Sequence, residues 1–193
     1  MEERLAYTEG AEQPIAMHPK KFALWLFIVS VVMIFAGMTS AFIVRQGEGN
    51  WLDYNLPGIL WFTSGIILLS SASMHWAYQS AKNDRIPNLK IALSLTTLLG
   101  MVFLVGQWYS WVALVANNVY FVGNPAGSFM YVLTGLHAAH LISGVIFLII
   151  VLISSFRYKI HSQRMNTIEM CATYWHFLGG LWIYLFVFLL LNH

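Results

Sequence analysis

The feature that most constrains the fold of this 193-residue chain is a set of five long apolar runs that contain no Asp, Glu or Arg. The hydrocarbon core of a bilayer is about 30 Å thick, so a helix needs about 20 apolar residues to cross it. Lipid offers the backbone no hydrogen-bond partners, and a helix satisfies its backbone groups internally. The sequence therefore predicts an all-α integral membrane protein, a five-transmembrane-helix bundle with spans at about 22–44, 57–78, 89–115, 129–153 and 172–191.

The composition fits lipid as the main solvent of the chain. Charged residues make up 9% of the sequence, whereas a soluble domain is about a quarter charged. The net charge of +2 is too small to indicate nucleic-acid binding. The single cysteine, Cys171, excludes an internal disulfide and a multi-thiolate metal site within this chain. We expect a polar cytoplasmic tail at 1–21, not a cleaved signal peptide, and one transmembrane domain at 22–193.

The basic residues predict how the helices are oriented. Cytoplasmic loops of membrane proteins carry an excess of Lys and Arg. If the five helices alternate, nine of the ten basic residues fall on one side and only Arg45 falls on the other. The N-terminus is therefore predicted to be cytoplasmic and the C-terminus to lie on the opposite side. We expect a multi-pass protein of the cell's inner (plasma) membrane.

The placement of the carboxylates disfavours an autonomous transporter. Pumps and ion-coupled transporters generally need ionisable groups at depth in the membrane. All eight carboxylates of this chain fall in the tail or in loops. Transporters also use broken helices, but we expect Pro125 and Gly127 to form a turn in a loop.

Four histidines are the sharpest polar feature of the predicted spans. His137 and His140 are three residues apart, which places them on one face of the fourth span. His75 and His176 lie near the cytoplasmic ends of the second and fifth spans. We favour hydrogen bonding between helices or at the headgroups. The alternative is that His75 and His176 ligate a b-type haem, since their depths match.

Small residues mark positions where helices are expected to pack closely. The first span carries two pairs of small residues spaced four apart, Ala36 with Ser40 and Gly37 with Ala41. The second span carries a small polar patch over 70–73, and the fifth carries two adjacent glycines at 179 and 180. We interpret all of these as packing positions.

Five segments, in chain order, resemble subunit III of the haem–copper oxidases. They are WLFIVSVVMIFAGMTSAFIVR (25–45), LLSSASMHWA (68–77), GMVFLVGQWYSW (100–111), GSFMYVLTGLHAAHLISG (127–144) and YWHFLGGLWIYLF (174–186). The resemblance extends over nearly the whole chain, from Trp25 to Leu191, and the chain is similar to the shorter, five-helix form of the subunit. The resemblance implies a respiratory, electron-transport function in aerobic respiration.

The resemblance implies a non-catalytic subunit with no haem, copper or other cofactor of its own. Haem and copper are expected in partner subunits, and a bound phospholipid in this one. The chain would pack on catalytic subunit I, beside other oxidase subunits and possible supercomplex partners, and stabilise a complex that reduces oxygen to water and translocates protons. The family positions expected to matter, through helix packing and lipid contact, are His137, His140, Tyr174, Trp175 and His176.

Three departures from the family pattern remove acidic residues. Val31, Ser110 and Gly179 stand where the family has carboxylates. We therefore expect no transmembrane proton route through this chain, and any help to proton uptake to come from surface groups such as Glu169 or His161. The electron donor, cytochrome c or quinol, is left open. The alternative function is a haem-b membrane anchor of a respiratory dehydrogenase, using the two histidines named above.

Overall fold

The computed structural model describes residues 19–52, 54–156 and 165–192, and it is helical almost throughout. Its helices are α1 (Pro19–Gly47), α2 (Ile59–Lys82), α3 (Ile86–Ala116), α4 (Pro125–Phe156) and α5 (Asn166–Asn192). All five are long and apolar enough to cross a membrane, which confirms the predicted all-helical class. The predicted tail up to residue 18, the connection around His161 and the terminal His193 lie outside the described residues.

We call the end where α1 begins the inner end and the end where it finishes the outer end, after the predicted orientation. At the outer end, α4 begins at Pro125, so the expectation that Pro125 and Gly127 form a loop turn was wrong. Proline fits the first turn of a helix because the backbone N–H that it lacks has no helical partner there. The Asn124 side chain caps this start by accepting a hydrogen bond from the Ala126 backbone N–H at 2.9 Å.

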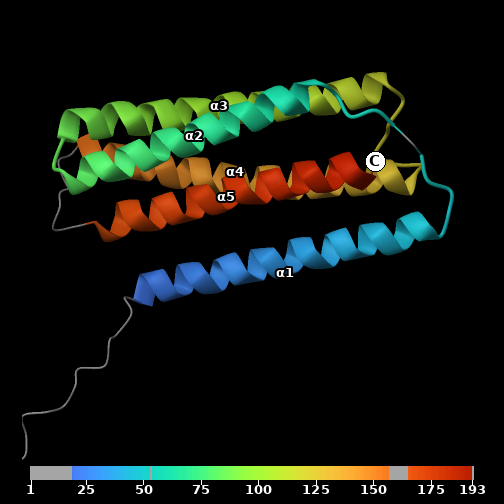
Figure 1. Cartoon of the computed structure of the whole chain (residues 1–193), viewed down its shortest axis with the longest axis horizontal. Coiled ribbons are helices and arrows are strands. Elements are labelled where there is room, and N and C mark those ends of the chain that lie inside the picture. The colour runs from blue at the N-terminus through green and yellow to red at the C-terminus, as the bar shows by residue number, and fades with distance from the viewer. Residues whose placement is uncertain (1–18, 53, 157–164, 193) are drawn as a thin grey trace, which may run out of the picture.

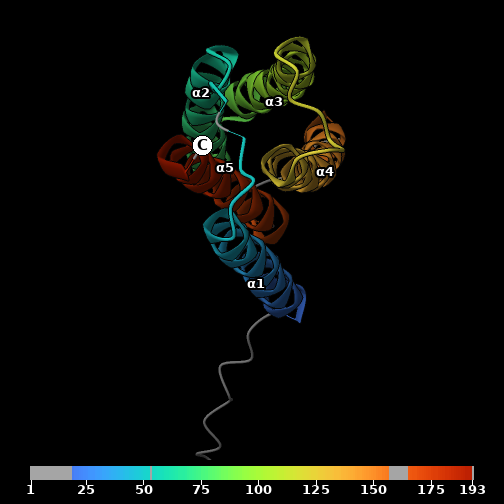
Figure 2. The same cartoon turned by 90° about the vertical axis from the view of Figure 1, so that its right-hand side faces the viewer.

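Helices α2, α3, α4 and α5 form a closed group, and helix α1 lies outside it. Seen end-on, α2, α3, α4 and α5 surround a common interior, and α1 lies beyond α5 (Figures 1 and 2). Helix α2 packs on α3, α3 on α4 and α4 on α5, and α5 returns to α2 to close the group. Helix α1 contacts α5 and α4.

The interface between α2 and α3 is built from small polar residues, as the patch over 70–73 predicted. The Ser73 hydroxyl donates to the Ala92 carbonyl oxygen at 3.0 Å, and the Thr96 hydroxyl donates to Ser73 Oγ at 3.1 Å. The Ser70 hydroxyl donates to the Thr96 carbonyl oxygen at 3.3 Å. Small side chains let the two backbones approach closely, which favours helix association in lipid.

Helix α1 docks through a narrow seam of larger side chains. Its buried residues recur every three or four positions: Ile28, Val31, Phe35, Thr39 and Phe42. The small pairs that were expected to pack, Ala36 with Ser40 and Gly37 with Ala41, are exposed. A Cβ built on Gly37 would meet no atom within 4 Å. The small residues of α1 therefore do not make helix contacts within the described chain, because the seam is one narrow stripe and they lie outside it.

Candidate functional site

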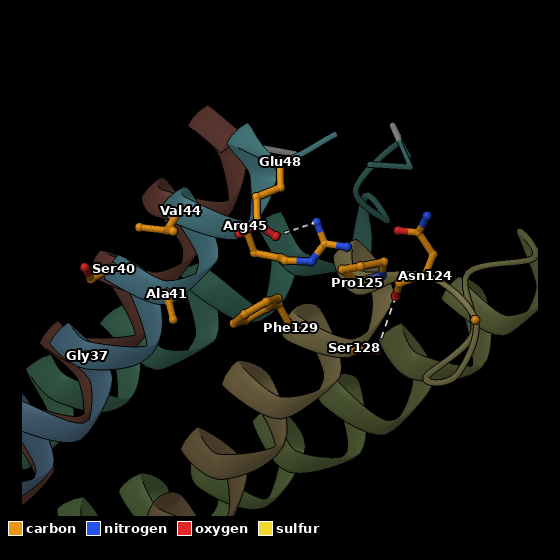
Figure 3. Close-up of a pocket in the computed structure, with 11 residues that line it drawn as sticks. Gly37, Ser40, Ala41, Val44, Arg45, Glu48, Asn124, Pro125, Ser128 and Phe129 are labelled. Carbon is orange, nitrogen blue, oxygen red and sulfur yellow. Dashed lines mark hydrogen bonds and ion pairs between the residues drawn. The ribbon is translucent and has the colours of Figure 1, made fainter. Parts of the chain in front are cut away.

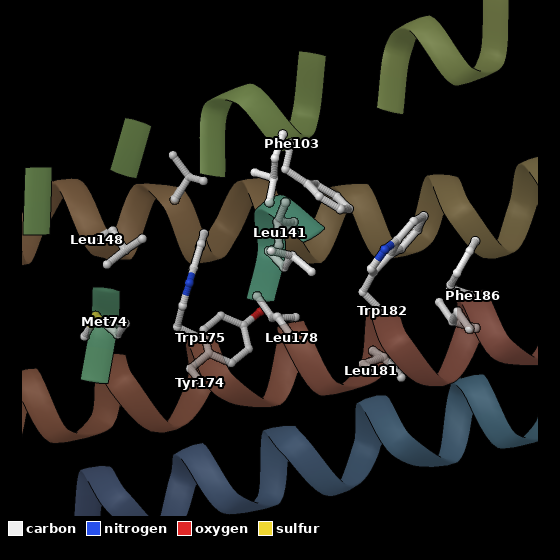
Figure 4. Packing of buried hydrophobic residues seen from close by; sticks show 14 of the residues in the cluster. Met74, Phe103, Leu141, Leu148, Tyr174, Trp175, Leu178, Leu181, Trp182 and Phe186 are labelled. Carbon is white, nitrogen blue, oxygen red and sulfur yellow. The ribbon is translucent and has the colours of Figure 1, made fainter. Parts of the chain in front are cut away.

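Trp175 is the centre of the packing between α5 and three other helices. Its side chain is buried, and its indole N–H donates to Ser70 Oγ on α2 at 3.1 Å. The ring fits between two glycines: a Cβ on Gly100 of α3 would lie 2.7 Å from Trp175 Cη2, and one on Gly144 of α4 would lie 3.4 Å from Cε3. Beside the indole, which Figure 4 shows on α5, the Gly100 position leaves no room for a side chain.

His137 lies in a second aromatic layer, nearer the outer end. It is fully buried, with its ring centroid 5.2 Å from that of Trp182 and 6.1 Å from that of Phe103. The Trp182 indole N–H donates to Ser64 Oγ on α2 at 3.0 Å. Neither ring nitrogen of His137 has a hydrogen-bond partner among the described residues. Ring packing, and not the interhelical hydrogen bond that the sequence suggested, holds His137 in place here.

His140 faces away from this interior, toward α1. Its ring centroid lies 5.9 Å from that of Phe35 and 6.2 Å from that of Phe27, and its Nδ1 lies 2.8 Å from the Leu136 carbonyl oxygen. Two residues three positions apart differ in direction by about 60° around a helix with 3.6 residues per turn. Since α4 borders both the four-helix interior and α1, this angle lets the two neighbouring histidines contact different helices, His137 toward α3 and α5 and His140 toward α1.

Tyr174 completes the junction of α1, α4 and α5. Its hydroxyl lies 2.7 Å from Ser143 Oγ on α4 and donates to the His140 carbonyl oxygen at 3.3 Å. Its ring centroid is 5.8 Å from that of Phe27 on α1. Tyr174 and Trp175 are adjacent in sequence and therefore point to different neighbours, one to the α1 side and one into the four-helix interior.

His176 and His75 lie together toward the inner end. Their ring centroids are 6.4 Å apart, as the matched depths predicted. A hydrogen bond of 2.6 Å joins His176 Nδ1 to Ser71 Oγ, and His75 Nε2 lies 3.3 Å from Gln79 Nε2. The adjoining cavity, also bordered by Glu169, measures about 250 Å³. This is below the 300–1,000 Å³ typical of cofactor pockets.

The described part of the chain contains no group of three or more His, Cys, Asp or Glu side chains that could hold a metal ion. The three positions that depart from the family's acidic pattern are all buried: Val31 in the α1 seam, Ser110 on α3, and Gly179 against α2. Ser110 donates its hydroxyl hydrogen to the Gly106 carbonyl oxygen at 3.0 Å. These sites offer packing atoms and one hydroxyl, but no carboxylate.

Two cavities flank α1, one on each side. The first, of about 820 Å³, lies between α1 and α4 at the outer end (Figure 3). The second, of about 460 Å³, lies between α1 and α5 and is lined almost entirely by apolar atoms, including Ala36, Gly180 and Tyr184. The exposed small residues of α1 line both cavities. Both cavities are therefore grooves between α1 and its neighbouring helices that no side chain of the described residues fills.

Sequence reasoning did not identify the polar contacts that attach α1. Lys21 Nζ forms an ion pair with Glu169 Oε2 at 2.8 Å, and the Thr39 hydroxyl lies 3.0 Å from the Tyr184 hydroxyl. Near the outer end, Gln46 Nε2 donates to the Asn192 carbonyl oxygen at 3.2 Å. No local pattern signals these contacts, because the partners are separated by 145 to 148 residues. Only the opposite charges of Lys21 and Glu169 offered a hint.

Comparison with known proteins identifies the family to which this sequence is similar. The sequence model of the family "Cytochrome c oxidase subunit III" matches residues 54–192. Cytochrome c oxidase subunit 3 of Corynebacterium diphtheriae is 29% identical over 170 residues, covering 84% of this chain and 82% of the relative. The subunits 3 of Osphranter robustus and Oryctolagus cuniculus are 30% and 28% identical, each covering 93% of this chain and 72% of the relative.

Proposed function

Because the chain belongs to the cytochrome c oxidase subunit III family, we propose that it is the non-catalytic subunit III of a respiratory haem–copper oxidase. It packs on the catalytic subunit and stabilises the complex that reduces oxygen to water and translocates protons. The family match over residues 54–192 is the observation that carries this proposal. Haem and copper belong to the partner subunits, and the name of the relatives points to cytochrome c as the electron donor.

The contacts of the five candidate positions support a structural role. Trp175 joins α5 to α2, α3 and α4, and Tyr174 joins α5 to α4 and α1. His137 and His140 pack against rings on neighbouring helices, and His176 bonds across to α2. Each position links helices, which fits a subunit whose task is to present a stable surface to its partners.

Lipid binding forms the second part of the proposal. The cavities on the two sides of α1 are open grooves along a helix that faces the bilayer over most of its surface. Lipid tails pack against apolar side chains as readily as other helices do, so small residues that line a groove can accept an acyl chain. We assign to these grooves the phospholipid that the resemblance implies.

The orientation is part of the same proposal: the inner end is cytoplasmic, in the cell's inner (plasma) membrane. Exposed Lys82 and the neighbouring Arg85 lie at that end, in keeping with the excess of basic residues in cytoplasmic loops. We expect cysteine labelling of Asn83→Cys and of a residue added after His193 to come from opposite sides of the membrane. Labelling of both from the same side would contradict five alternating spans.

A haem-b anchor is the second candidate function, because His75 and His176 do lie together. Two observations weigh against it. The Nε2 atom of His75 is near Gln79 on its own helix, and the adjoining cavity is small. A reduced-minus-oxidised spectrum of the isolated chain should lack a b-type haem band. A stoichiometric band that disappears in His75→Ala or His176→Ala would favour the anchor.

The test of the main proposal is the complex that purifies with an affinity-tagged copy of this chain. We expect haem and copper in stoichiometric amounts, an oxygen-reducing activity, and a larger subunit that carries the metals. Removing this chain should lower the yield and thermal stability of the complex more than its initial rate of oxygen reduction. Purification with a dehydrogenase, or without any metal-containing partner, would refute the proposal.

A further inference from the structure

Two buried polar side chains in the four-helix interior have no hydrogen-bond partner among the described residues. Gln107 on α3 is 1% exposed, and no other described group bonds to its Oε1 or Nε2 atom. His137 on α4 is 0% exposed, and the described residues likewise leave both of its ring nitrogens unbonded. A buried polar group without a partner is costly, and in folded proteins another protein group or an ordered water normally supplies the bond. These four atoms therefore indicate a bound ligand.

Gln107 and His137 lie at the same depth in the bundle. Helices α3 and α4 are antiparallel, and the Trp111 indole N–H on α3 donates to Thr134 Oγ1 on α4 at 3.0 Å. Gln107 precedes Trp111 by four residues, and His137 follows Thr134 by three. At the rise of an α-helix these steps are about 6 Å and about 4.5 Å toward the inner end, so the two residues are level to within about 1.5 Å. They share one layer, yet no hydrogen bond joins them directly.

The surroundings of this layer restrict what the ligand can be. The His137 ring centroid lies 6.1 Å from that of Phe103 and 5.2 Å from that of Trp182, and Figure 4 shows these two rings in the packed interior. The sequence from 91 to 156 contains no Asp, Glu, Lys or Arg, so the facing parts of α3 and α4 offer no charge to balance an ion. An amide and a neutral imidazole each present both a donor and an acceptor. The ligand must be small and uncharged, and it must both donate and accept hydrogen bonds.

We propose that bound water bridges Gln107 and His137 inside the four-helix group. A water can donate to Gln107 Oε1 and to the unprotonated nitrogen of His137, and it can accept from the N–H groups of both side chains. Buried waters typically make about three hydrogen bonds to groups that otherwise lack partners. The site lies wholly within this chain, so it does not depend on which subunits surround the chain.

The bridge extends a polar link between α3 and α4. Toward the outer end the two helices are joined directly, by the bond from Trp111 to Thr134 and by the Tyr131 hydroxyl, which donates to the Trp111 carbonyl oxygen at 3.4 Å. Water-mediated hydrogen bonds are nearly as favourable as direct ones. The bridging water carries the link about one helical turn farther into the membrane, and it gives His137 an interhelical bond through water in place of a direct one.

A cryo-electron-microscopy map of the complex that purifies with the full-length chain tests the proposal. The map must show other buried waters of the complex, which serve as the internal reference. We expect a density peak within about 2.7–3.2 Å of a polar atom of Gln107 and of a ring nitrogen of His137. A map in which the amide bonds directly to the imidazole would overturn the proposal. So would a map that shows the reference waters but no peak between the two side chains.

A pair of variants identifies what holds the peak. Gln107→Met keeps a side chain of similar length but removes both polar atoms, so the peak should disappear. His140→Phe is the matched control, because it alters a histidine of the same helix whose ring packs against Phe35 on α1, and the peak should remain. A peak that persists in Gln107→Met would contradict the bridge. The map of the unaltered complex decides the question even if this variant fails to assemble.

Discussion

Helix α1 and helix α5 are both strongly apolar, yet they bury different shares of their length. The most apolar 18-residue stretch of α1 has a mean hydropathy of 2.4 and is 28% buried within the chain. The corresponding stretch of α5 has a lower mean hydropathy, 1.8, and is 50% buried. Lipid tails are as apolar as the side chains, so hydrophobicity does not draw one transmembrane helix to another. The difference shows that shape and polar contacts decide which helices associate here.

The two regions also differ in how their contacts are distributed. Within the four-helix group, Trp175 and Trp182 each combine a buried ring with an indole hydrogen bond to a serine on α2. Among the described residues, helix α1 is attached through its narrow seam and three separate polar contacts, which begin at Lys21, Thr39 and Gln46. The four-helix group is therefore a continuous packed unit, whereas α1 is an attached helix with grooves on both sides.

The largest expected effect comes from adding one methyl group to the packed unit. In Gly100→Ala the new Cβ would lie 2.7 Å from the Trp175 ring, which is too close for a rigid indole to accept. Overpacking of this kind costs about 3 kcal/mol at its upper range. Gly37→Ala on α1 is the matched control, since its Cβ meets nothing within 4 Å, and it should change stability by less than about 0.5 kcal/mol. The thermal unfolding midpoint of the purified complex is measured for each variant. Equal shifts for Gly100→Ala and Gly37→Ala would show that α1 is packed as tightly as the four-helix group.

A smaller loss is expected when a polar anchor of each region is removed. Trp175→Phe deletes the indole N–H donor to Ser70 and part of a buried ring, at a cost of about 2 kcal/mol. Tyr184→Phe deletes only the contact with Thr39 on α1, and interhelical hydrogen bonds in membranes average about 0.6 kcal/mol. Thermal unfolding of the two variants compares them directly. A Tyr184→Phe variant that proved the less stable of the two would place the stronger anchor on α1.

The ion pair at the inner end should contribute less still. Lys21 and Glu169 side chains are 29% and 41% exposed, and exposed ion pairs contribute at most about 1 kcal/mol. A double-mutant cycle with Lys21→Gln and Glu169→Gln isolates the coupling energy. We expect it to fall further when salt is raised, because salt screens exposed charges. A coupling that is large and insensitive to salt would mean that a partner subunit covers this end.

A similarly small effect is expected at His137, whose described contacts are ring contacts. His137→Phe keeps the packing against Phe103 and Trp182 and should change stability by about 1 kcal/mol or less. Phenylalanine cannot carry a proton, so the same variant tests for an imidazole relay. We expect the number of protons pumped per electron by the intact complex to be unchanged. A lower ratio with assembly and electron transfer preserved would show that His137 takes part in proton movement.

The sequence was sufficient to predict where the helices lie in the chain, but not which helices pack against one another. Lipid forces an apolar run to satisfy its own backbone, so run length alone predicted five helices. Gly37 and Gly100 both lie in apolar helices near other small residues, yet only Gly100 faces an aromatic ring from another helix. Which glycine is covered depends on helix rotation and partner choice, and neither leaves a local pattern in the sequence.

Some contacts of the candidate residues could be predicted from the sequence and others could not. The meeting of His75 with His176 followed from matched depth. The spacing placed His137 and His140 on neighbouring positions of α4, but it did not predict that one contacts rings of α3 and α5 and the other rings of α1, because spacing gives the angle between two side chains and not the partner of each. The groove beside Arg45 was not predicted at all, since the residues of its two walls, Gly37 to Glu48 and Gly123 to Phe129, are 75 residues or more apart in the chain.

The partners of the α1 contacts are far apart in the sequence, so they are synthesised at different times. Lys21 meets Glu169, 148 residues later, and chains are elongated at about 5–20 residues per second. Helix α1 therefore enters the membrane on the order of ten seconds before its docking surface on α5 has been translated. During that interval α1 lacks its contacts with α5 and lies in lipid over most of its surface, a state suited to a segment with no charged residue from 22 to 44. The same segment remains largely exposed in the finished fold, with 28% of its most apolar stretch buried, so α1 has a lipid-compatible surface both before and after it docks.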